Sequence, residues 1–197
     1  MKTGWIAVAR NLPLAALLLV TACGDRNVTL AYAALPASAT QNIPQRGAVV
    51  VEPFTDERPD KSVIGAARNT YYMRAADAVT TSDIGRWATD ALKIELTRSG
   101  YRVVAASGAT QDMPRISGRV TEVNCDSYLT YDGTVTFAGV VKAGQTELLQ
   151  GIYSARGNGG GNLVGDSPGF ARCLNDALGK ALQIFLADLA AKNIAQQ

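Results

Sequence analysis

The sequence contains no histidine, and this absence removes much enzyme chemistry at once. Without an imidazole the chain cannot form a Ser-His-Asp or Cys-His catalytic site, and it lacks the commonest metal-binding side chain. Cysteine is also scarce, with three residues among 197, and none of them has the CxxC spacing of a zinc site. The sequence therefore predicts no metal and no other cofactor.

An excess of positive charge is also missing. The chain has 19 Lys and Arg, of which Lys2 and Arg10 lie near its start, and the other 17 equal the 17 Asp and Glu in number. Nucleic-acid binding needs clustered positive charge. A chain with this balance therefore argues against a nucleic-acid partner.

A long hydrophobic run is absent too. The apolar stretch at residues 12–20 is about half of the roughly 20 residues that a membrane-spanning helix needs, so we do not expect a retained transmembrane anchor. Lys2 and Arg10 precede this stretch and small residues follow it, which is the layout of a secretory signal. Residues 20–23, Val-Thr-Ala-Cys, resemble a bacterial lipobox. We therefore expect residues 1–22 to be a lipoprotein signal peptide and Cys23 to be the lipid attachment site.

Lipid on Cys23 predicts a stable membrane anchor. The lipid consists of a diacylglyceryl group and an added fatty acid such as palmitate. Two or three acyl chains hold a protein at a bilayer stably, whereas a single chain does not. In signals of this kind an Asp directly after the cysteine resembles an inner-membrane retention signal. Here Gly24 occupies that position and Asp25 comes one place later. We therefore expect the protein to lie on the periplasmic side of the outer membrane.

Two cysteines, Cys125 and Cys173, remain after lipid attachment. An even remainder in an oxidising compartment favours one disulfide between them. The alternative is two separate buried thiols, because sequence does not show whether the two Cα atoms approach within about 7 Å.

Residue patterns divide the mature chain into a tether and one domain. Residues 23–46 contain small polar residues and prolines and are predicted to be a lipid-anchored tether, while residues 47–197 are predicted to be a single α+β domain. Apolar spacings of three and four predict amphipathic helices at 82–99 and from residue 167 onward. Strands are predicted at 47–54, 101–105, 115–128, 135–141 and 146–156. We expect a mostly antiparallel sheet of four to five strands with both helices packed on one face.

Glycine marks two predicted breaks in this sheet. The pair Asp132-Gly133 is typical of a hairpin, so a turn is predicted at residues 130–134. Residues 157–162, Gly-Asn-Gly-Gly-Gly-Asn, match neither common phosphate-binding motif. They are predicted to form a mobile loop.

The densest charged cluster lies at residues 56–61. As an interaction turn, Asp56, Arg58 and Asp60 would present charge to a partner, with Arg58 binding a carboxylate or phosphate through two bonds. As a solvated loop, the opposite charges would pair with one another, and exposed pairs contribute only ~0–1 kcal/mol. We favour the solvated loop and keep these three residues as the candidate interaction turn.

Four tyrosines offer a similar choice. Tyr71, Tyr72, Tyr128 and Tyr131 suit an interaction surface, where tyrosine is enriched. Tyrosine is also an ordinary strand residue. We favour packing within the sheet.

With these pieces assembled, the chain resembles the YajG-type lipoprotein family of Gram-negative bacteria. The matching pieces are the lipobox at 20–23, the charged turn at 56–60, the helix at 82–99 and its exit at Gly100-Tyr101. The resemblance covers most of the mature chain. It implies an envelope location and an α+β fold, and it brings no catalytic motif.

These observations predict a non-enzymatic lipoprotein that acts as an accessory or interaction module in the cell envelope. Its expected partners are the membrane, through the lipid, and an envelope protein or peptidoglycan. Two alternatives stay open. A periplasmic glycan hydrolase or binder would use Glu52 and Asp56, and a hydrolase would need them about 5 to 9 Å apart in a cleft. A carrier of an apolar ligand would need a cavity between the helices and the sheet.

Overall fold

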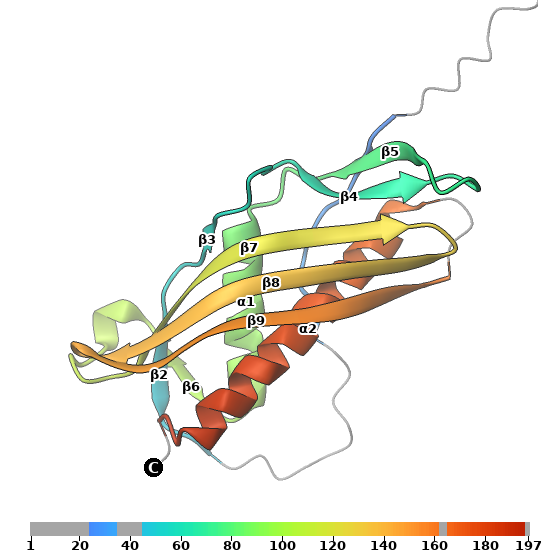
Figure 1. Ribbon diagram of the computed structural model, residues 1–197. Helices are drawn as coiled ribbons and strands as arrows, with labels where there is room; N and C mark the ends of the chain where they lie inside the picture. Colours follow the sequence, from blue (N-terminus) through green and yellow to red (C-terminus); the bar gives the residue numbers. More distant parts are fainter. Residues whose placement is uncertain (1–23, 35–44, 162–164, 196–197) are drawn as a thin grey trace, which may run out of the picture.

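A computed structural model describes residues 24–34, 45–161 and 165–195. The predicted signal peptide, Cys23 and most of the second half of the predicted tether lie outside the described residues. In the described part, nine strands form one sheet, and two long helices cover the same face of it (Figure 1). Neither of these helices, nor any other in the described part, is long and apolar enough to cross a membrane.

The secondary-structure elements alternate irregularly along the chain. The helices are α1 (Ile84–Arg98) and α2 (Ser167–Ala191), with a short 3₁₀ turn at Ala106–Gly108. The strands are β1 (Arg26–Asn27), β2 (Ala48–Val51), β3 (Thr55–Asp56), β4 (Val63–Arg68), β5 (Arg74–Val79), β6 (Arg102–Val104), β7 (Arg115–Ser127), β8 (Thr130–Ala143) and β9 (Thr146–Gly161).

The sheet is mixed, so the prediction of a mostly antiparallel sheet of four to five strands is wrong. Five of the eight strand pairings in the described part are parallel, namely β1–β5, β2–β6, β2–β7, β3–β7 and β4–β7. Antiparallel pairing joins β4 to β5 and runs through the long strands β7, β8 and β9. Strand β7 is central, because β8 pairs along one side of it while β2, β3 and β4 pair along the other. The α+β class itself is confirmed.

The two helices pack through the apolar stripes that the sequence predicts. On α1, the residues Trp87, Ala88 and Leu92 are buried, and on α2 the residues Phe170 and Leu182 are buried as well. The indole N–H of Trp87 also donates a hydrogen bond to the side chain of Asn175, which links the two helices over 3.1 Å. Burial of these stripes against the sheet is the main source of helix stability in proteins of this kind.

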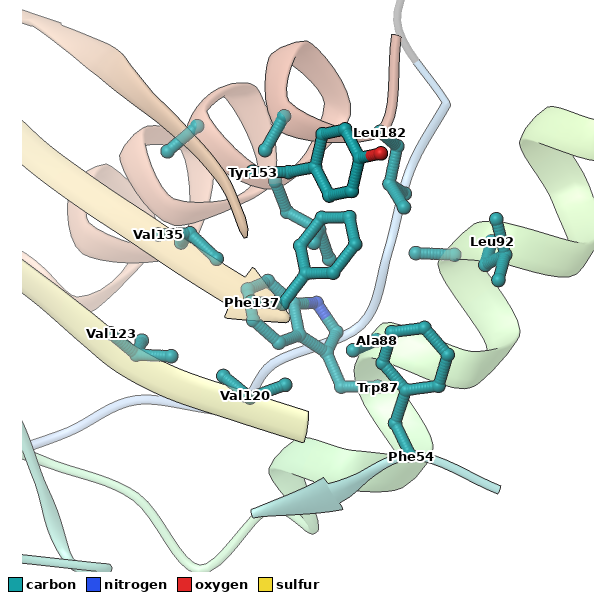
Figure 2. Packing of buried hydrophobic residues seen from close by; sticks show 14 of the residues in the cluster. Phe54, Trp87, Ala88, Leu92, Val120, Val123, Val135, Phe137, Tyr153 and Leu182 are labelled. Atoms are coloured by element: carbon teal, nitrogen blue, oxygen red, sulfur yellow. The ribbon is translucent and has the colours of Figure 1, made fainter. Parts of the chain in front are cut away.

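Aromatic rings fill the centre of the core. The ring of Phe137 on β8 has no exposed surface, and its centroid lies 5.7 Å from that of Phe54, 5.4 Å from Tyr153 and 6.0 Å from Phe185. Figure 2 shows Phe137 among side chains that come from the strands and from both helices. At these separations the rings adopt tilted, stacked and edge-to-face contacts, which stabilise more than burial alone. This part of the interior, between α2 and the sheet, is therefore occupied by side chains.

Two glycine-based predictions need correction. The turn between β7 and β8 lies at Tyr128-Leu129, and Gly133 lies inside β8 instead of in a hairpin turn. A Cβ atom at Gly133 would lie 2.6 Å from the carbonyl oxygen of Asn124, so this glycine permits a close approach. Residues 157–161 likewise belong to β9, and a Cβ at Gly157 would lie 2.1 Å from the carbonyl oxygen of Cys173 on α2. The glycines of β9 thus let a helix lie directly against a strand.

The tyrosine at the centre of this core predicts a sensitivity to alkaline pH. Tyr153 is buried and its hydroxyl donates to Asp188 over 3.2 Å. Burial, followed by the charge and hydrogen bond of Asp188, raises the pKa of Tyr153 to about 12. The unfolded state loses this proton near its ordinary pKa of about 10, so the folded state holds more protons between about pH 10 and pH 12. The stabilisation is therefore complete below about pH 10 and is lost as the pH rises toward 12.

We expect Tyr153→Phe to remove part of this alkaline loss. The variant should lose about 1 kcal/mol at neutral pH with the hydrogen bond, and its stability should then fall less steeply above about pH 10. Denaturant titrations followed by circular dichroism across this range give the slope. The slope that remains belongs in part to Tyr131, whose pKa is raised first of all by burial. Tyr71→Phe, at a position 81% exposed, is the control, and an equal effect there would contradict the assignment.

Candidate functional site

In the charged turn at residues 56–61, the charged side chains form hydrogen bonds with other groups of the same turn. The Arg58 side chain is only 3% exposed, and its Nε and Nη2 atoms donate to the two carboxylate oxygens of Asp56 over 3.0 and 2.9 Å. Its Nη1 and Nη2 atoms also donate to the backbone carbonyls of Val63 and Lys61 over 2.9 and 2.7 Å. With its guanidinium buried and engaged in this way, Arg58 holds the loop in shape and presents little surface to a ligand.

Asp60 has a similar local role. One of its carboxylate oxygens accepts from the backbone N–H and the hydroxyl of Ser62 over 2.9 and 2.8 Å, and from the N–H of Val63 over 3.2 Å. Such bonds from an Asp to the residues that follow it are typical of a turn that the side chain stabilises. The structure thus brings Asp56, Arg58 and Asp60 into one turn, in which Arg58 is buried against Asp56 while Asp60 stays exposed and bonds to the residues that follow it.

The carboxylates of the hydrolase alternative have cations as partners. Burial alone would raise the pKa of Asp56, but the hydrogen bonds and charge of Arg58, together with the charge of Lys61, outweigh it and lower that pKa. A glycosidase needs one carboxyl with a raised pKa as its general acid, so Asp56 does not suit that role. Glu52 lies near Arg115 instead, with 3.8 Å between Oε1 and Nη1.

The two remaining cysteines are free thiols, so the predicted disulfide is absent from the structure. Cys125 on β7 and Cys173 on α2 are both buried. They come close at Gly133, where an added Cβ would lie 2.8 Å from the Cys173 sulfur and 2.9 Å from the Cys125 Cβ. Interaction with the Cys173 thiol, and then burial, raise the pKa of Cys125, which disfavours the reactive thiolate. The even number of cysteines thus correctly indicated that Cys125 and Cys173 lie near each other, but it did not show that they are thiols and not a disulfide.

Metal ligands do not gather elsewhere in the described ranges. No group of three or more Cys, Asp or Glu side chains there is placed to hold a metal ion.

The described part of the predicted tether is packed into the domain. Val28 and Leu30 are buried, and the N–H of Val28 donates to the carbonyl of Val79 over 2.8 Å, just beyond the pairing of β1 with β5. The amide of Asn175 on α2 donates to the carbonyl of Ala31 over 2.8 Å. The chain therefore joins the sheet at Arg26, three residues after Cys23 in the sequence. In the sequence, the alternating apolar residues Val28 and Leu30 are compatible with a packed, extended segment, but two residues are too few to distinguish such a segment from a tether.

Surface hollows occur on two sides of the described structure. One of about 740 Å³ lies at the end of the sheet where β2 and β6 pair, and there Arg46 covers the ring of Tyr101 at 5.1 Å and donates to its hydroxyl over 3.1 Å. We call it the Arg46 groove. Another of about 430 Å³ runs along α1 beside Ala31. Both open at the surface, whereas a carrier of an apolar ligand would need its cavity between the helices and the sheet.

Exposed aromatic and apolar side chains gather at the opposite end of the sheet. Tyr71 is 81% exposed, Tyr72 and Met73 are each 59% exposed, and Leu129 is 64% exposed. They lie on the β4–β5 turn and the β7–β8 turn, and the ring of Tyr128 meets that of Tyr72 edge to face at 5.3 Å. We call these five residues the aromatic tip. The prediction that Tyr71 and Tyr72 pack within the sheet is wrong.

Comparison with known proteins defines the class by fold. No family model matches the chain, and no curated protein matches it in sequence. A Xanthomonas campestris protein assigned to the DUF330 family is similar with a TM-score of 0.55 and 12% identity, over 84% of this chain and 94% of that one. A hypothetical protein from Chlamydia trachomatis gives a TM-score of 0.50 and 10% identity, over 77% and 100% of the two chains.

At these identities the likeness shows the fold alone. The chain therefore has the α+β fold seen in the DUF330 protein. A lipoprotein from Neisseria meningitidis aligns with a TM-score of 0.36 and 15% identity, over 74% of this chain and 96% of that one, which is too distant to support an argument. The resemblance to the YajG-type family stays a prediction, because none of these three structures is named for that family.

Proposed function

We propose that this protein is a lipid-anchored, non-enzymatic module on the periplasmic face of the outer membrane, where it binds another component of the envelope. The observation that carries the proposal is the course of the N-terminal segment. Strand β1 pairs with β5 from Arg26 onward, and the chain is then buried at Val28 and Leu30. Lipid on Cys23 would thus attach almost directly to the folded domain.

A short link restricts where such a domain can work. Two residues separate Cys23 from Arg26, and the three steps between them span at most roughly 11 Å. A long flexible tether would let the domain reach across the periplasm, whereas this link holds it at the bilayer surface. That geometry suits a subunit of a membrane-associated assembly.

The Arg46 groove supports the choice of a protein or glycan partner. Arg46 and Arg102 line it together with Tyr101, and Arg and Tyr are the residue types that most often dominate binding surfaces. It also borders β6, which among the described strands pairs with β2 alone and so ends the sheet on that side. An edge strand next to a groove offers a partner both backbone hydrogen bonds and side-chain contacts.

Replacement of the lipid-bearing residue tests the anchor. In a Gram-negative host, we expect the native chain to carry acyl chains on its N-terminal cysteine, by mass spectrometry, and to fractionate with the outer membrane. Cys23→Ala should lose the lipid and leave the membrane fraction, because the acyl chains supply the binding. Cross-linking followed by affinity purification should then recover a stoichiometric envelope partner with the native chain only. Equal partners from both chains would contradict the proposal.

The residue after the cysteine tests the choice of membrane. Gly24→Asp places an acidic residue where inner-membrane retention signals have one, so this variant should keep its lipid and move to the inner-membrane fraction. Gly24→Ser is the matched control and should stay in the outer membrane. If Gly24→Asp left the distribution between the two membranes unchanged, residue 24 would not determine the choice of membrane, and the outer-membrane assignment would be contradicted.

A further inference from the structure

We propose that the aromatic tip is a membrane-contact surface, which inserts into the interfacial region of the same bilayer that holds the lipid on Cys23. The inference rests on the proposed anchor and adds to it a second, protein-borne contact with the membrane. It also fixes which end of the domain faces the bilayer.

The aromatic tip is held in shape by its own turn. The side-chain oxygen of Asn69 accepts from the backbone N–H groups of Tyr71 and Met73, each over 3.0 Å. Tyr72 adopts a left-handed backbone conformation, with φ of 62°, and its ring lies under the guanidinium of Arg68 at 4.6 Å. These contacts keep the side chains of residues 71–73 outside the fold, where they are exposed although the turn itself is ordered by hydrogen bonds.

The second turn completes the surface. The hydroxyl of Tyr128 donates to the carbonyl of Thr70 over 3.2 Å, which joins the β7–β8 turn to the β4–β5 turn. Leu129 follows at the apex of its turn and is 64% exposed. The parallel pairing of Ala67 with Ser127 brings the two turns to the same end of the sheet. Exposed residues from two distant parts of the sequence therefore form one surface.

The composition of this surface fits the interface of a bilayer. The two turns, residues 69–73 and 128–130, contain no charged residue, and the guanidinium that lies on the Tyr72 ring, that of Arg68, is paired with Asp126 over 2.6 Å. Tyrosine combines an apolar ring with a hydroxyl and is enriched at the level of lipid headgroups. Single exposed apolar residues are common on proteins, but a group of neighbours marks an interaction surface.

The direction of the chain identifies the bilayer as the occupant. Strand β1 runs parallel to β5, with Arg26 opposite Ala78. Followed backward from Asn27 to Arg26, β1 therefore points toward the start of β5 at Arg74, which directly follows the aromatic tip. The four residue steps from Ala78 to Arg74 span roughly 13 Å, and Cys23 lies three residues before Arg26 in the sequence.

Figure 1 shows the same relation. The blue segment that contains β1 lies beside β5, and the β4–β5 and β7–β8 turns lie together at one end of the sheet. Strands β2 and β6, whose residues border the Arg46 groove, lie at the other end of the sheet. A bilayer that binds lipid on Cys23 would thus be next to the aromatic tip, while the groove would face away from it.

Depth-dependent quenching tests the contact on the full, lipidated chain. The protein is purified from membranes and reconstituted into vesicles of phosphatidylethanolamine and phosphatidylglycerol that contain acyl-chain nitroxide lipids. A bimane probe is attached to Leu129→Cys and, in a second protein, to Tyr71→Cys. Ile152→Cys is the matched control, because Ile152 is apolar and 78% exposed but lies in the middle of β9. The unsubstituted chain, whose Cys125 and Cys173 are buried, gives the background of labelling.

We expect several-fold stronger quenching at positions 129 and 71 than at 152. Equal, weak quenching at all three positions in protein that floats with the vesicles would overturn the tip contact and leave the anchor standing. Protein that carries no lipid on Cys23 by mass spectrometry and does not float would overturn the proposed function and, with it, this inference. Circular dichroism of each labelled protein confirms that the comparison is made on folded chains.

Discussion

Phe137→Ala is expected to lower the free energy of unfolding by about 4 kcal/mol. The ring lies in the fully enclosed centre of the core and contacts Phe54, Tyr153 and Phe185, so its removal leaves a cavity that α2 and the sheet cannot close. For a domain of this size the melting temperature should fall by about 10 °C. Denaturant unfolding followed by circular dichroism measures the change.

Ile152→Ala is the matched control for this prediction. Ile152 is paired with Ala138, the neighbour of Phe137 in β8, but its side chain is 78% exposed. Its truncation should change the stability by less than about 0.5 kcal/mol. If the two truncations cost the same, the centre of the core would lie elsewhere.

Arg58→Met is expected to cost about 3 kcal/mol, because it removes the buried partner of a partly buried ion pair in which the Asp56 side chain is 18% exposed. The carboxylate of Asp56 and the carbonyls of Val63 and Lys61 would all lose a donor. The depressed pKa of Asp56 has a further consequence, since a carboxyl with a lowered folded pKa stabilises above its unfolded pKa and loses that contribution as the pH falls. Below about pH 4 the free energy of unfolding of the variant should therefore fall less steeply with decreasing pH than that of the native chain.

Two further variants separate the geometry of Arg58 from its charge. Lys61 also contacts Asp56, with 3.6 Å between Nζ and Oδ1, but its side chain is 57% exposed, so Lys61→Ala should cost at most about 1 kcal/mol. Arg58→Lys keeps the charge and loses the planar fork that reaches both oxygens of Asp56, so it should behave more like Arg58→Met. If Arg58→Lys were as stable as the native chain, the charge of Arg58 alone would matter. If an Arg58 variant kept its stability but lost the envelope partner, residues 56–60 would instead be an interaction turn.

The helices could be predicted from sequence because their signal is local. Apolar spacing and end signals place the first helix at 82–99, and the structure has α1 at Ile84–Arg98. The second begins as predicted at Ser167. A helix satisfies its hydrogen bonds within one segment, so the residues that determine it are adjacent in sequence.

The sheet could be predicted only in part, because its signal lies in distant partners. Strand β5 reads Arg-Ala-Ala-Asp-Ala-Val, with Val79 as its single β-branched residue and no aromatic residue, and it forms because β4 and β1 pair with it. The Asp132-Gly133 pair misled for a related reason. Its glycine is required by the close approach of Cys173 and the neighbouring strand rather than by a turn.

The candidate site was predictable as a cluster but not in its role. Sequence brings Asp56, Arg58 and Asp60 together, yet only the structure shows that Arg58 turns inward. The sequence offers Tyr71, Tyr72 and Tyr128 of the aromatic tip as an interaction surface but favours sheet packing, because the parallel pairing of β4 with β7 that brings their two turns together is not visible in the sequence. The positions of β4 and β7 in the sequence do not predict that these two strands pair.

The central position of β7 has a consequence for the order in which this chain folds. Strands β7, β8 and β9 are joined by short turns and can pair early, whereas β2, β3 and β4 pair in parallel with a strand that follows them only after α1. Such non-local pairing is slow, because the long loop must close before the contacts stabilise it. During synthesis the N-terminal half emerges first, and its β4–β5 and β2–β6 pairs wait for β7 to join them into one sheet. We expect this half to be the part that chaperones protect and proteases cut until the C-terminal hairpins arrive.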